Sequence, residues 1–304
     1  MHKSVSSYAL LIMICAISVF MSTTGYAQVV HNEKSLYRNI LVEDEGDLRC
    51  LKFNVRSSKT QQSCYFKSQP QTLVFNYTKL LMSGLLFNPE PKRVLIVGLG
   101  GGTMSNALTQ LFPKAKIDNI EIDEAVIKVA RRYFSFVENN NIRTLNQDGR
   151  IFIKRALLKK QSYDWIILDA FNGDYIPEHL LTKEFLQETK QLLSDNGILT
   201  ANTFSLSQLY AHESATYKAV FGDFYQVMHQ KNSNRIILAT KRNTNFNRIN
   251  STQINHLQSK LKPYNVDIKQ VFSKITYTKN NQDWPENTRI LTDQFSPANL
   301  LNSH

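Results

Sequence analysis

The sequence has few of the residues that carry the commonest metal-binding and hydrolytic motifs. Its 304 residues include three cysteines and seven histidines, and the histidines lack the spacing of metal ligands. No H-E-x-x-H, G-x-S-x-G or paired C-x-x-C motif occurs. His179, in the segment IPEHLL, is interpreted as a local loop contact. We therefore expect no metal site.

Acidic residues are also fewer than basic residues. The chain has 25 of the former and 36 of the latter, which gives a formal net charge of +11. This surplus favours anionic partners or surfaces. However, no run of lysine and arginine is interleaved with aromatic residues, as a nucleic-acid groove would require. We therefore expect no nucleic-acid partner.

The N-terminal segment has the features of an export signal. Its apolar run from Tyr8 to Phe20 is too short to be a comfortable membrane span. Lys3 precedes this run, and small residues follow it in GYA, as at a signal-peptidase site. We expect a signal peptide over residues 1–27, a mature chain without a stable membrane span, and a periplasmic or secreted location. The alternative is an uncleaved N-terminal anchor.

Two cysteines remain after such a signal is removed. Cys50 and Cys64 flank short strand-like runs, LRCLKFNV and SCYFK, with a polar segment between them. An even pair in an oxidising compartment favours a disulfide. Two free buried thiols are the alternative.

The hydropathy pattern predicts an α/β fold. Near-continuous apolar strands that alternate with amphipathic helices are typical of a parallel sheet covered on both faces. The strands are expected at Arg93–Val97, Lys116–Ile120, Ile142–Leu145, Trp165–Leu168 and Ile198–Asn202. The helices are expected at Met104–Leu111, Glu124–Phe134, Arg150–Leu158 and Thr182–Leu193.

The flanking segments have other patterns. A small N-terminal β domain is expected over residues 28–74, the Rossmann-like core over 75–245 and a C-terminal extension over 246–304. Within the core, FYQVM and RIILAT predict an antiparallel hairpin. In the extension, STQINHLQSKLK predicts a helix and KQVFSKITYT predicts a strand.

The segment VLIVGLGGGTMSNAL predicts a strand, a glycine turn and a helix. Gly98, Gly100 and Gly102 allow positive φ angles and a close approach of the backbone to a ligand, and the helix start offers free N–H groups. Thr103 occupies the sixth place, so the turn departs from the G-x-G-x-x-G of nicotinamide cofactors. The alternative is a tight structural turn.

Two acids follow the next strands. Glu121 ends the strand in NIEID, beside the glycine turn, where a carboxylate can accept both hydroxyls of a ribose. Asp123 is expected to cap the next helix. Asp148, in NQDGR, can accept from the exocyclic amine of an adenine. The alternatives are a solvated strand end for Glu121 and a helix cap for Asp148, and the two roles of Asp148 are compatible.

A third group of candidates follows the fourth core strand. Asp169 ends that strand, and Asn172 and Asp174 lie on the loop beyond it. Open α/β sheets place catalytic groups at this edge. The alternative for Asp169 is a buried carboxylate that only holds loops together.

Together these segments resemble the polyamine aminopropyltransferase (spermidine synthase-like) family, a branch of the class I S-adenosylmethionine-dependent methyltransferase fold. The resemblance covers residues 35–242 and rests on LYRNILVED, FNYTKLL, PEPKRVLIVGLGGG, IEIDEAVIKVARRYF, QDGRIFI and YDWIILDAF. It implies a co-substrate of the S-adenosyl type, either decarboxylated S-adenosylmethionine or S-adenosylmethionine, and a small-molecule amine as acceptor. It also implies that Tyr77 faces the amine and that a homodimer is possible.

The sequence departs from this family where the amine is handled. Gly101 stands where the family's glycine turn carries an acid. Asn172 stands where the family has an aspartate that accepts the proton of the amine. An amide cannot act as a carboxylate base, so Asp174 or Asp169 would have to serve. In FNYTKLL, Thr78 and Lys79 replace an expected glutamine and acid, and Ser83 falls near an expected histidine.

Two classes of function follow. The first is a transferase on an S-adenosyl-type nucleotide, which transfers an aminopropyl group or, as a close variant, a methyl group to another acceptor. The second is an exported, non-catalytic binding protein that retains the fold. Export favours the second because donor nucleotides are not expected outside the cytoplasm. The glycines, Glu121 and Asp148 together favour the first.

Overall fold

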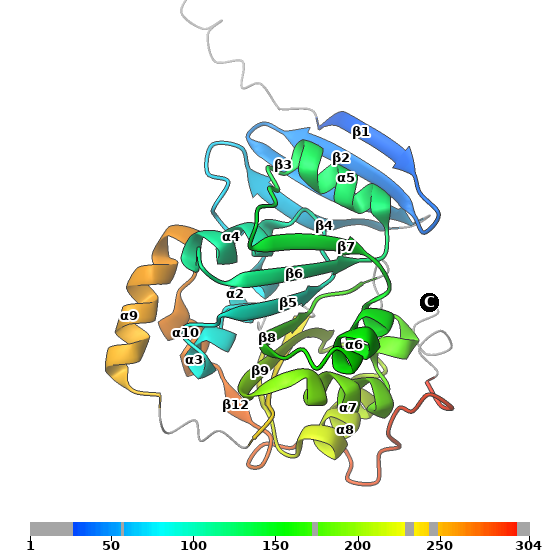
Figure 1. Ribbon diagram of the computed structural model, residues 1–304, viewed down its shortest axis with the longest axis vertical. Coiled ribbons are helices and arrows are strands. Elements are labelled where there is room, and N and C mark those ends of the chain that lie inside the picture. Colours follow the sequence, from blue (N-terminus) through cyan, green and yellow to red (C-terminus); the bar gives the residue numbers. More distant parts are fainter. Residues whose placement is uncertain (1–26, 56–57, 172–175, 229–233, 243–248, 297–304) are drawn as a thin grey trace, which may run out of the picture.

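The computed structural model describes residues 27–55, 58–171, 176–228, 234–242 and 249–296. It contains two β-sheets (Figure 1), an antiparallel N-terminal sheet of four strands and a mixed sheet of eight strands covered by helices on both faces. The predicted fold class is confirmed. The proposed signal sequence lies almost wholly outside the described residues. No helix in the described ranges is both long enough and apolar enough to cross a membrane.

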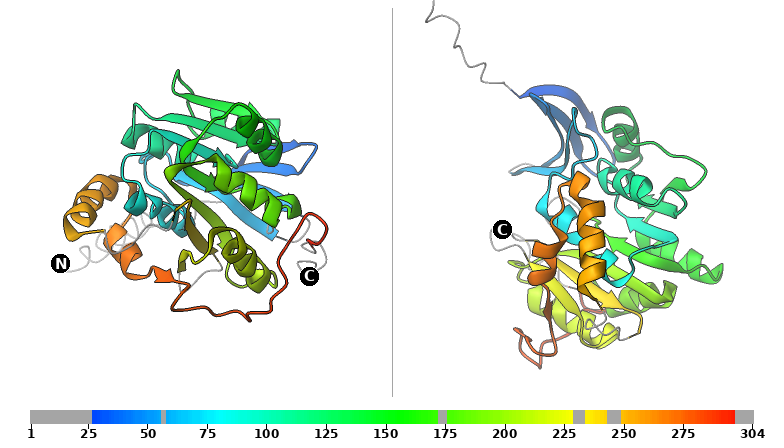
Figure 2. Two further views of the ribbon diagram at one scale, coloured as in Figure 1. Left: turned by 60° about the horizontal axis from the view of Figure 1, so that its bottom comes forward. Right: turned by 90° about the vertical axis from the view of Figure 1, so that its left-hand side faces the viewer.

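The N-terminal sheet is a simple meander. It comprises β1 (Gln28–Lys34), β2 (Asn39–Glu45), β3 (Leu48–Val55) and β4 (Ser58–Phe66), paired in that order. Alternate residues such as Val42 and Leu51 are buried on one face, where they pack against Val126 and Phe134. Cys50 and Cys64 lie directly opposite each other on β3 and β4, and their sulfur atoms are 2.04 Å apart. Figure 2 shows this sheet as a layer at one end of the core.

The eight-stranded sheet has the order β12-β10-β11-β9-β8-β5-β6-β7. Strands β5 to β9 are parallel, and β11 pairs antiparallel with both β9 and β10. The strands are β5 (Arg93–Val97), β6 (Lys116–Glu121), β7 (Ile142–Asn146), β8 (Tyr163–Leu168), β9 (Leu193–Phe204), β10 (Tyr225–Met228), β11 (Asn234–Thr240) and β12 (Thr276–Tyr277). The expected core strands and the hairpin are therefore present.

Helices cover both faces of this sheet because alternate residues of each central strand point to opposite sides. On β5, Val94 and Ile96 pack on the side of α4, α9 and α10, whereas Leu95 and Val97 pack on the side of α6, α7 and α8. The α-helices are α2 (Asn76–Leu81), α3 (Gly84–Phe87), α4 (Thr103–Leu111), α5 (Glu124–Tyr133), α6 (Gly149–Leu158), α7 (Lys183–Leu192), α8 (Tyr210–Phe221), α9 (Ser251–Leu261) and α10 (Ile268–Ser273).

Side-chain caps fix where several of these helices begin. In each case an oxygen of the N-cap side chain accepts from a backbone N–H of the first turn, which would otherwise lack a partner. The capping residues are Asp123, Asp148, Thr182, Asn250 and Asp267.

The strand expected over KQVFSKITYT is wrong. Residues 268–273 form α10, which begins at the Asp267 cap and buries Ile268 and Val271 at a helical spacing. Only Thr276 and Tyr277 are extended, as the edge strand β12. The cap and the tertiary packing outweigh the strand propensity of this short apolar run.

Candidate functional site

A cavity lies at the carboxyl ends of the central parallel strands. Its base is the glycine turn after β5, and its sides are formed by the residues that follow β6, β7 and β8. The N-terminal sheet and α2 complete the wall. The lining side chains that these two elements and the residue before β2 contribute are Arg38, Phe53, Gln62, Ser63, Tyr77 and Thr78.

The glycine turn is shaped by close backbone contacts. Gly98, Gly100 and Gly102 have φ angles of 98°, 55° and 73°, which favour glycine. A Cβ atom at Gly98 would also collide with the carbonyl oxygen of Asp169. Gly98 and Gly100 line the cavity, whereas Gly102 precedes α4 as its N-cap residue.

Gly101 is enclosed by other side chains. A Cβ atom at this position would lie 2.7 Å from Cδ1 of Phe134 and 2.8 Å from Oγ of Ser63. Real Cβ atoms do not approach other heavy atoms so closely, so a larger residue would require both neighbours to move. The position that is expected to carry an acid in related chains is therefore closed to an acid here.

Glu121 is fixed in the cavity wall at the end of β6. Its side chain is buried, with the residue 8% exposed, so the alternative of a solvated strand end is wrong. Oε2 accepts from the backbone N–H of Leu99 and Oε1 accepts from that of Asp123, both at 3.0 Å. Burial raises the pKa of Glu121, and the two N–H groups oppose this rise. Each oxygen keeps a lone pair for a ligand hydroxyl.

Asp148 has two partners at the start of α6. Oδ1 accepts from the backbone N–H of Ile151 at 2.9 Å, which is the helix cap that the sequence allowed. Oδ2 lies 2.8 Å from Nε2 of His179, and this hydrogen bond is the main reason that the pKa of Asp148 is lowered. His179 also lines the cavity. Its side chain therefore contacts a residue of the candidate site, Asp148, which is distant in the sequence, and not only its own loop.

Asp169 lies in the cavity wall at the end of β8. Its Oδ1 accepts from Nδ2 of Asn202 at 3.0 Å, and Oδ1 of Asn202 accepts in turn from Nδ2 of Asn234 at 3.0 Å. Burial raises the pKa of Asp169 to about 7, and the Asn202 hydrogen bond opposes the rise. A carboxyl group with this pKa is partly ionised at neutral pH and can accept a proton.

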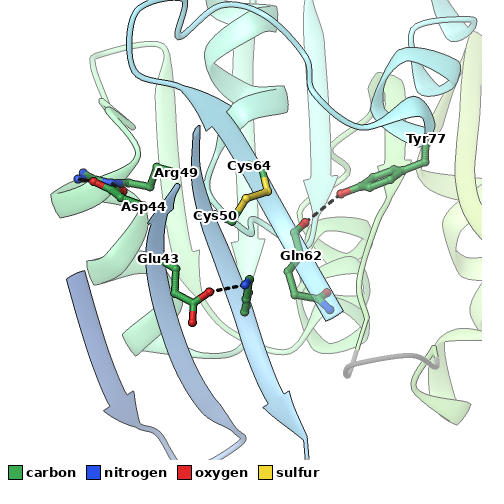
Figure 3. Close-up of a disulfide and its surroundings, with 8 residues drawn as sticks. Glu43, Asp44, Arg49, Cys50, Gln62, Cys64 and Tyr77 are labelled. Atoms are coloured by element: carbon green, nitrogen blue, oxygen red, sulfur yellow. Dashed lines mark hydrogen bonds and ion pairs between the residues drawn. A yellow bond between two sulfur atoms is a disulfide. The ribbon is translucent and has the colours of Figure 1, made fainter. Parts of the chain in front are cut away.

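Tyr77 also lines the cavity. Its hydroxyl donates to the carbonyl oxygen of Gln62 on β4 at 3.3 Å (Figure 3), which ties α2 to the N-terminal sheet. Burial raises the pKa of Tyr77 well above its ordinary value, and the charge of Asp169 raises it further. The neutral phenol is therefore the form present at neutral pH.

Several residues singled out in the sequence are not among the described residues that line the cavity. Asn172 and Asp174 lie outside the described residues. Lys79 and Ser83 are not among the lining residues, and Oγ of Ser83 donates to the carbonyl oxygen of Leu80. Thr78 does line the cavity. The positive charge of Lys79, which replaces an acid expected in the family, is therefore not at the cavity wall.

Arg38 is a lining residue that the sequence reasoning missed, although it lies in the quoted segment LYRNILVED. Its guanidinium stacks on the ring of Phe53 at 4.3 Å, and Nη1 donates to the carbonyl oxygen of Phe171 at 3.1 Å. Its Nε lies 3.7 Å from Oδ2 of Asp123. In the described part of the chain, no group of three or more His, Cys, Asp or Glu residues is arranged to hold a metal ion.

Comparisons with known proteins agree with this arrangement. The family model described as "Spermine/spermidine synthase domain" matches residues 74–238. A polyamine aminopropyltransferase of Vibrio vulnificus is 48% identical over 279 residues, which cover 91% of this chain and 92% of that protein.

Two solved structures show the same fold. A spermidine synthase in complex with the transition-state analogue AdoDATO gives a TM-score of 0.60 at 18% identity, over 81% of this chain and 88% of that chain. Human methyltransferase-like protein 13 in complex with SAH gives a TM-score of 0.54 at 23% identity, over 70% of this chain and 97% of that chain.

Proposed function

The chain belongs to the spermine/spermidine synthase family, and we propose that it transfers an alkyl group from an S-adenosyl-type nucleotide to a small amine. One observation carries the proposal. Glu121, Asp148 and Asp169 lie at or just beyond the carboxyl ends of three parallel strands of one sheet, and all three line one cavity around the glycine turn. A fold kept only as a scaffold would not need this set together.

The nucleotide would lie along the glycine turn. The two lone pairs of Glu121 that remain free would accept the ribose hydroxyls, and Asp148 would accept from the adenine amine. The structural neighbours with AdoDATO and SAH support a nucleotide of this type. An aminopropyl group from the decarboxylated nucleotide is the first candidate for the group transferred, as the name of the Vibrio relative suggests.

Asp169 would be the base of the reaction. An amine attacks only as its neutral form, so a group beside it must accept a proton. The carboxyl of Asp169 lies in the cavity wall, and its pKa of about 7 is suited to this task at neutral pH. Tyr77, as a neutral phenol near Asp169, would contact the acceptor. Asp174 remains the other candidate base, and Asn172 would only form hydrogen bonds.

A titration of the oxidised protein with methylthioadenosine tests the nucleotide site. We expect saturable binding that Glu121→Ala weakens at least about a hundredfold, because two hydrogen bonds to a charged acceptor are lost. Glu124→Ala is the matched control, since Glu124 is exposed and pairs with Lys128 on the surface of α5. No binding to the unaltered protein at millimolar concentration would refute the proposal.

We further propose that the protein is exported after cleavage of the N-terminal signal. The opposed cysteines of β3 and β4 support this, because disulfides persist in oxidising compartments. N-terminal sequencing of the protein from an envelope fraction should find a start near Gln28. A start at Met1 would contradict export with cleavage.

A further inference from the structure

Asp169 is held at one oxygen by a chain of two asparagine side chains, which we call the amide relay. Nδ2 of Asn202 donates to Oδ1 of Asp169 at 3.0 Å, and Nδ2 of Asn234 donates to Oδ1 of Asn202 at 3.0 Å. Asp169 follows β8, Asn202 lies near the end of β9, and Asn234 is the first residue of β11. These strands are neighbours in the sheet, so the relay runs across three strands toward the cavity.

The strand register brings the side chains of the relay together. β8 and β9 are parallel and paired up to their carboxyl ends, so Asp169 lies beside Asn202. Asn202 pairs with Ile236 on β11, and Asn234 precedes Ile236 by two residues, so both asparagine side chains lie on one face of the sheet. Asn202 is 3% exposed, so water does not readily replace its two partners.

The residue after Asn234 is anchored on the opposite face. Arg235 is 0% exposed, and its Nη2 donates to Oε2 of Glu213 on α8 at 3.1 Å. Its Nε donates to Oγ1 of Thr203, the residue after Asn202, at 2.9 Å. These bonds hold the start of β11 against β9, and they thereby fix the position from which Asn234 donates.

The relay has one polarity. An ionised carboxylate only accepts hydrogen bonds, so Asn202 must turn its NH2 group toward Asp169. The carbonyl oxygen of Asn202 then points the other way and needs a donor, which Asn234 supplies. The reverse orientation would place the carbonyl oxygen of Asn202 against the carboxylate and its NH2 group against that of Asn234. Asn234 therefore determines which end of the Asn202 amide meets Asp169.

We propose that Asn234 is a positioning residue for the transfer reaction, which acts through Asn202 to hold Oδ1 of Asp169 and leaves Oδ2 to accept the amine proton. The inference rests on the proposed function, because it takes Asp169 as the base. The hydrogen bond from Asn202 favours the ionised carboxylate and so opposes the rise in the pKa of Asp169 that burial causes. Without the relay, a smaller fraction of the protein would carry the carboxylate at neutral pH.

Other ionisable groups also lie around Asp169. On the opposite face of β9 and β11, Glu213, Tyr217 and Arg235 interact with one another. None of these groups is changed in the variants that follow, so their influence on Asp169 is common to every protein compared. Among the described residues, the ionisable groups that line the cavity with Asp169 are Arg38, Tyr77, Glu121, Asp148 and His179.

Reversal of the relay tests the inference. In Asn234→Asp, the new carboxylate would accept from Nδ2 of Asn202, so Asn202 would turn its carbonyl oxygen toward Asp169. NMR titration of isotopically labelled aspartate carboxyl groups gives the pKa of Asp169, whose signal is identified by its loss in Asp169→Asn. We expect this pKa to rise by about one in Asn234→Asp and in Asn202→Leu. The pH profile of kcat/KM for the amine, measured by methylthioadenosine release, should move in the same direction.

Two comparisons separate the relay from a general effect of charge. Asn234→Asp should raise the pKa of Asp169 clearly less in the Asn202→Leu background than in the unaltered protein, because the relay is already broken there. Asn88→Asp is the matched control, because Nδ2 of Asn88 donates to the carbonyl oxygen of Asp164 at the amino end of β8 and Asn88 does not line the cavity. This control should leave the pKa of Asp169 unchanged.

The other results overturn the inference in distinguishable ways. An unchanged pKa of Asp169 in Asn234→Asp refutes the relay and leaves the proposed function intact. So does an equal rise in both backgrounds, which would show that the new charge acts directly through space. A pKa that rises without any change in the pH profile refutes the inference together with the assignment of Asp169 as the base. Absence of methylthioadenosine release by the unaltered protein refutes the proposed function, and the NMR titration then decides on the relay alone. If Asn202→Leu does not fold, Asn202→Ala takes its place.

Discussion

Replacing Asp169 by asparagine should stabilise the protein at alkaline pH. The carboxyl of Asp169 is half-buried in the cavity wall, and its pKa in the folded protein is about 7 instead of the ordinary 3.8. An asparagine has nearly the same shape, and its Oδ1 can still accept from Nδ2 of Asn202. The variant therefore removes an ionisation while it keeps the packing and the hydrogen bond.

The sign follows from which state ionises first. Below about pH 4 the carboxyl of Asp169 is protonated in both the folded and the unfolded chain, so it does not affect the free energy of unfolding. Between about pH 4 and 7 the unfolded chain loses this proton while the folded protein keeps it, and stability falls as pH rises. Above about pH 7 the full cost is present. One pKa unit corresponds to about 1.36 kcal/mol, so a pKa difference of about three between the folded and unfolded states corresponds to about 4 kcal/mol of unfolding free energy.

Urea unfolding of both proteins between pH 4 and 8.5 measures this difference. The free energies of unfolding should agree within about 1 kcal/mol at pH 4, and the variant should be more stable by about 2 to 4 kcal/mol at pH 8. Other titrating groups are common to both proteins and cancel in the comparison. Parallel pH profiles, or a variant that is less stable at pH 8, would refute the burial argument for Asp169.

The remaining predictions concern stability and the nucleotide site. Gly101→Asp should lower the free energy of unfolding by about 1 to 3 kcal/mol in urea titrations, because its Cβ would press on Phe134; an unchanged stability would show that the site can open. Replacing Cys50 and Cys64 by serine should cost about 3 kcal/mol under oxidising conditions, as their separation is 14 residues, and clearly less under reducing conditions, where the loop is open in both proteins and only two buried thiols are replaced. Asp148→Ala should cost about 1 kcal/mol of stability and weaken methylthioadenosine binding; an effect on stability alone would limit Asp148 to its capping role.

The sequence predicted the parallel core because each strand is a short, nearly continuous apolar run. β5 and β8 are examples, and the helices between the strands begin at residues with capping side chains such as Asp123. Glu121 and Asp169 could be located because the ends of such strands meet at one edge of a sheet. The helix over residues 268–273 was missed, since a run of six residues has too few turns to show its period.

The part of the cavity wall that the N-terminal sheet and the residue before β2 supply could not be predicted in the same way. Arg38, Phe53, Gln62 and Ser63 reach the glycine turn only because the N-terminal sheet packs on α5 and the core. No local sequence pattern indicates that tertiary packing. The same holds for the enclosure of Gly101, which depends on two side chains far from it in the sequence.

Release of methylthioadenosine in the presence of donor and amine tests the central claim most directly. The oxidised mature protein is incubated with S-adenosylmethionine or its decarboxylated form and with a panel of small amines, and methylthioadenosine is quantified by chromatography. We predict release that depends on the amine and is lost in Asp169→Asn, while that variant still binds methylthioadenosine. Binding of the nucleotide without release for any donor and amine would contradict the assignment of a transferase and leave a binding protein.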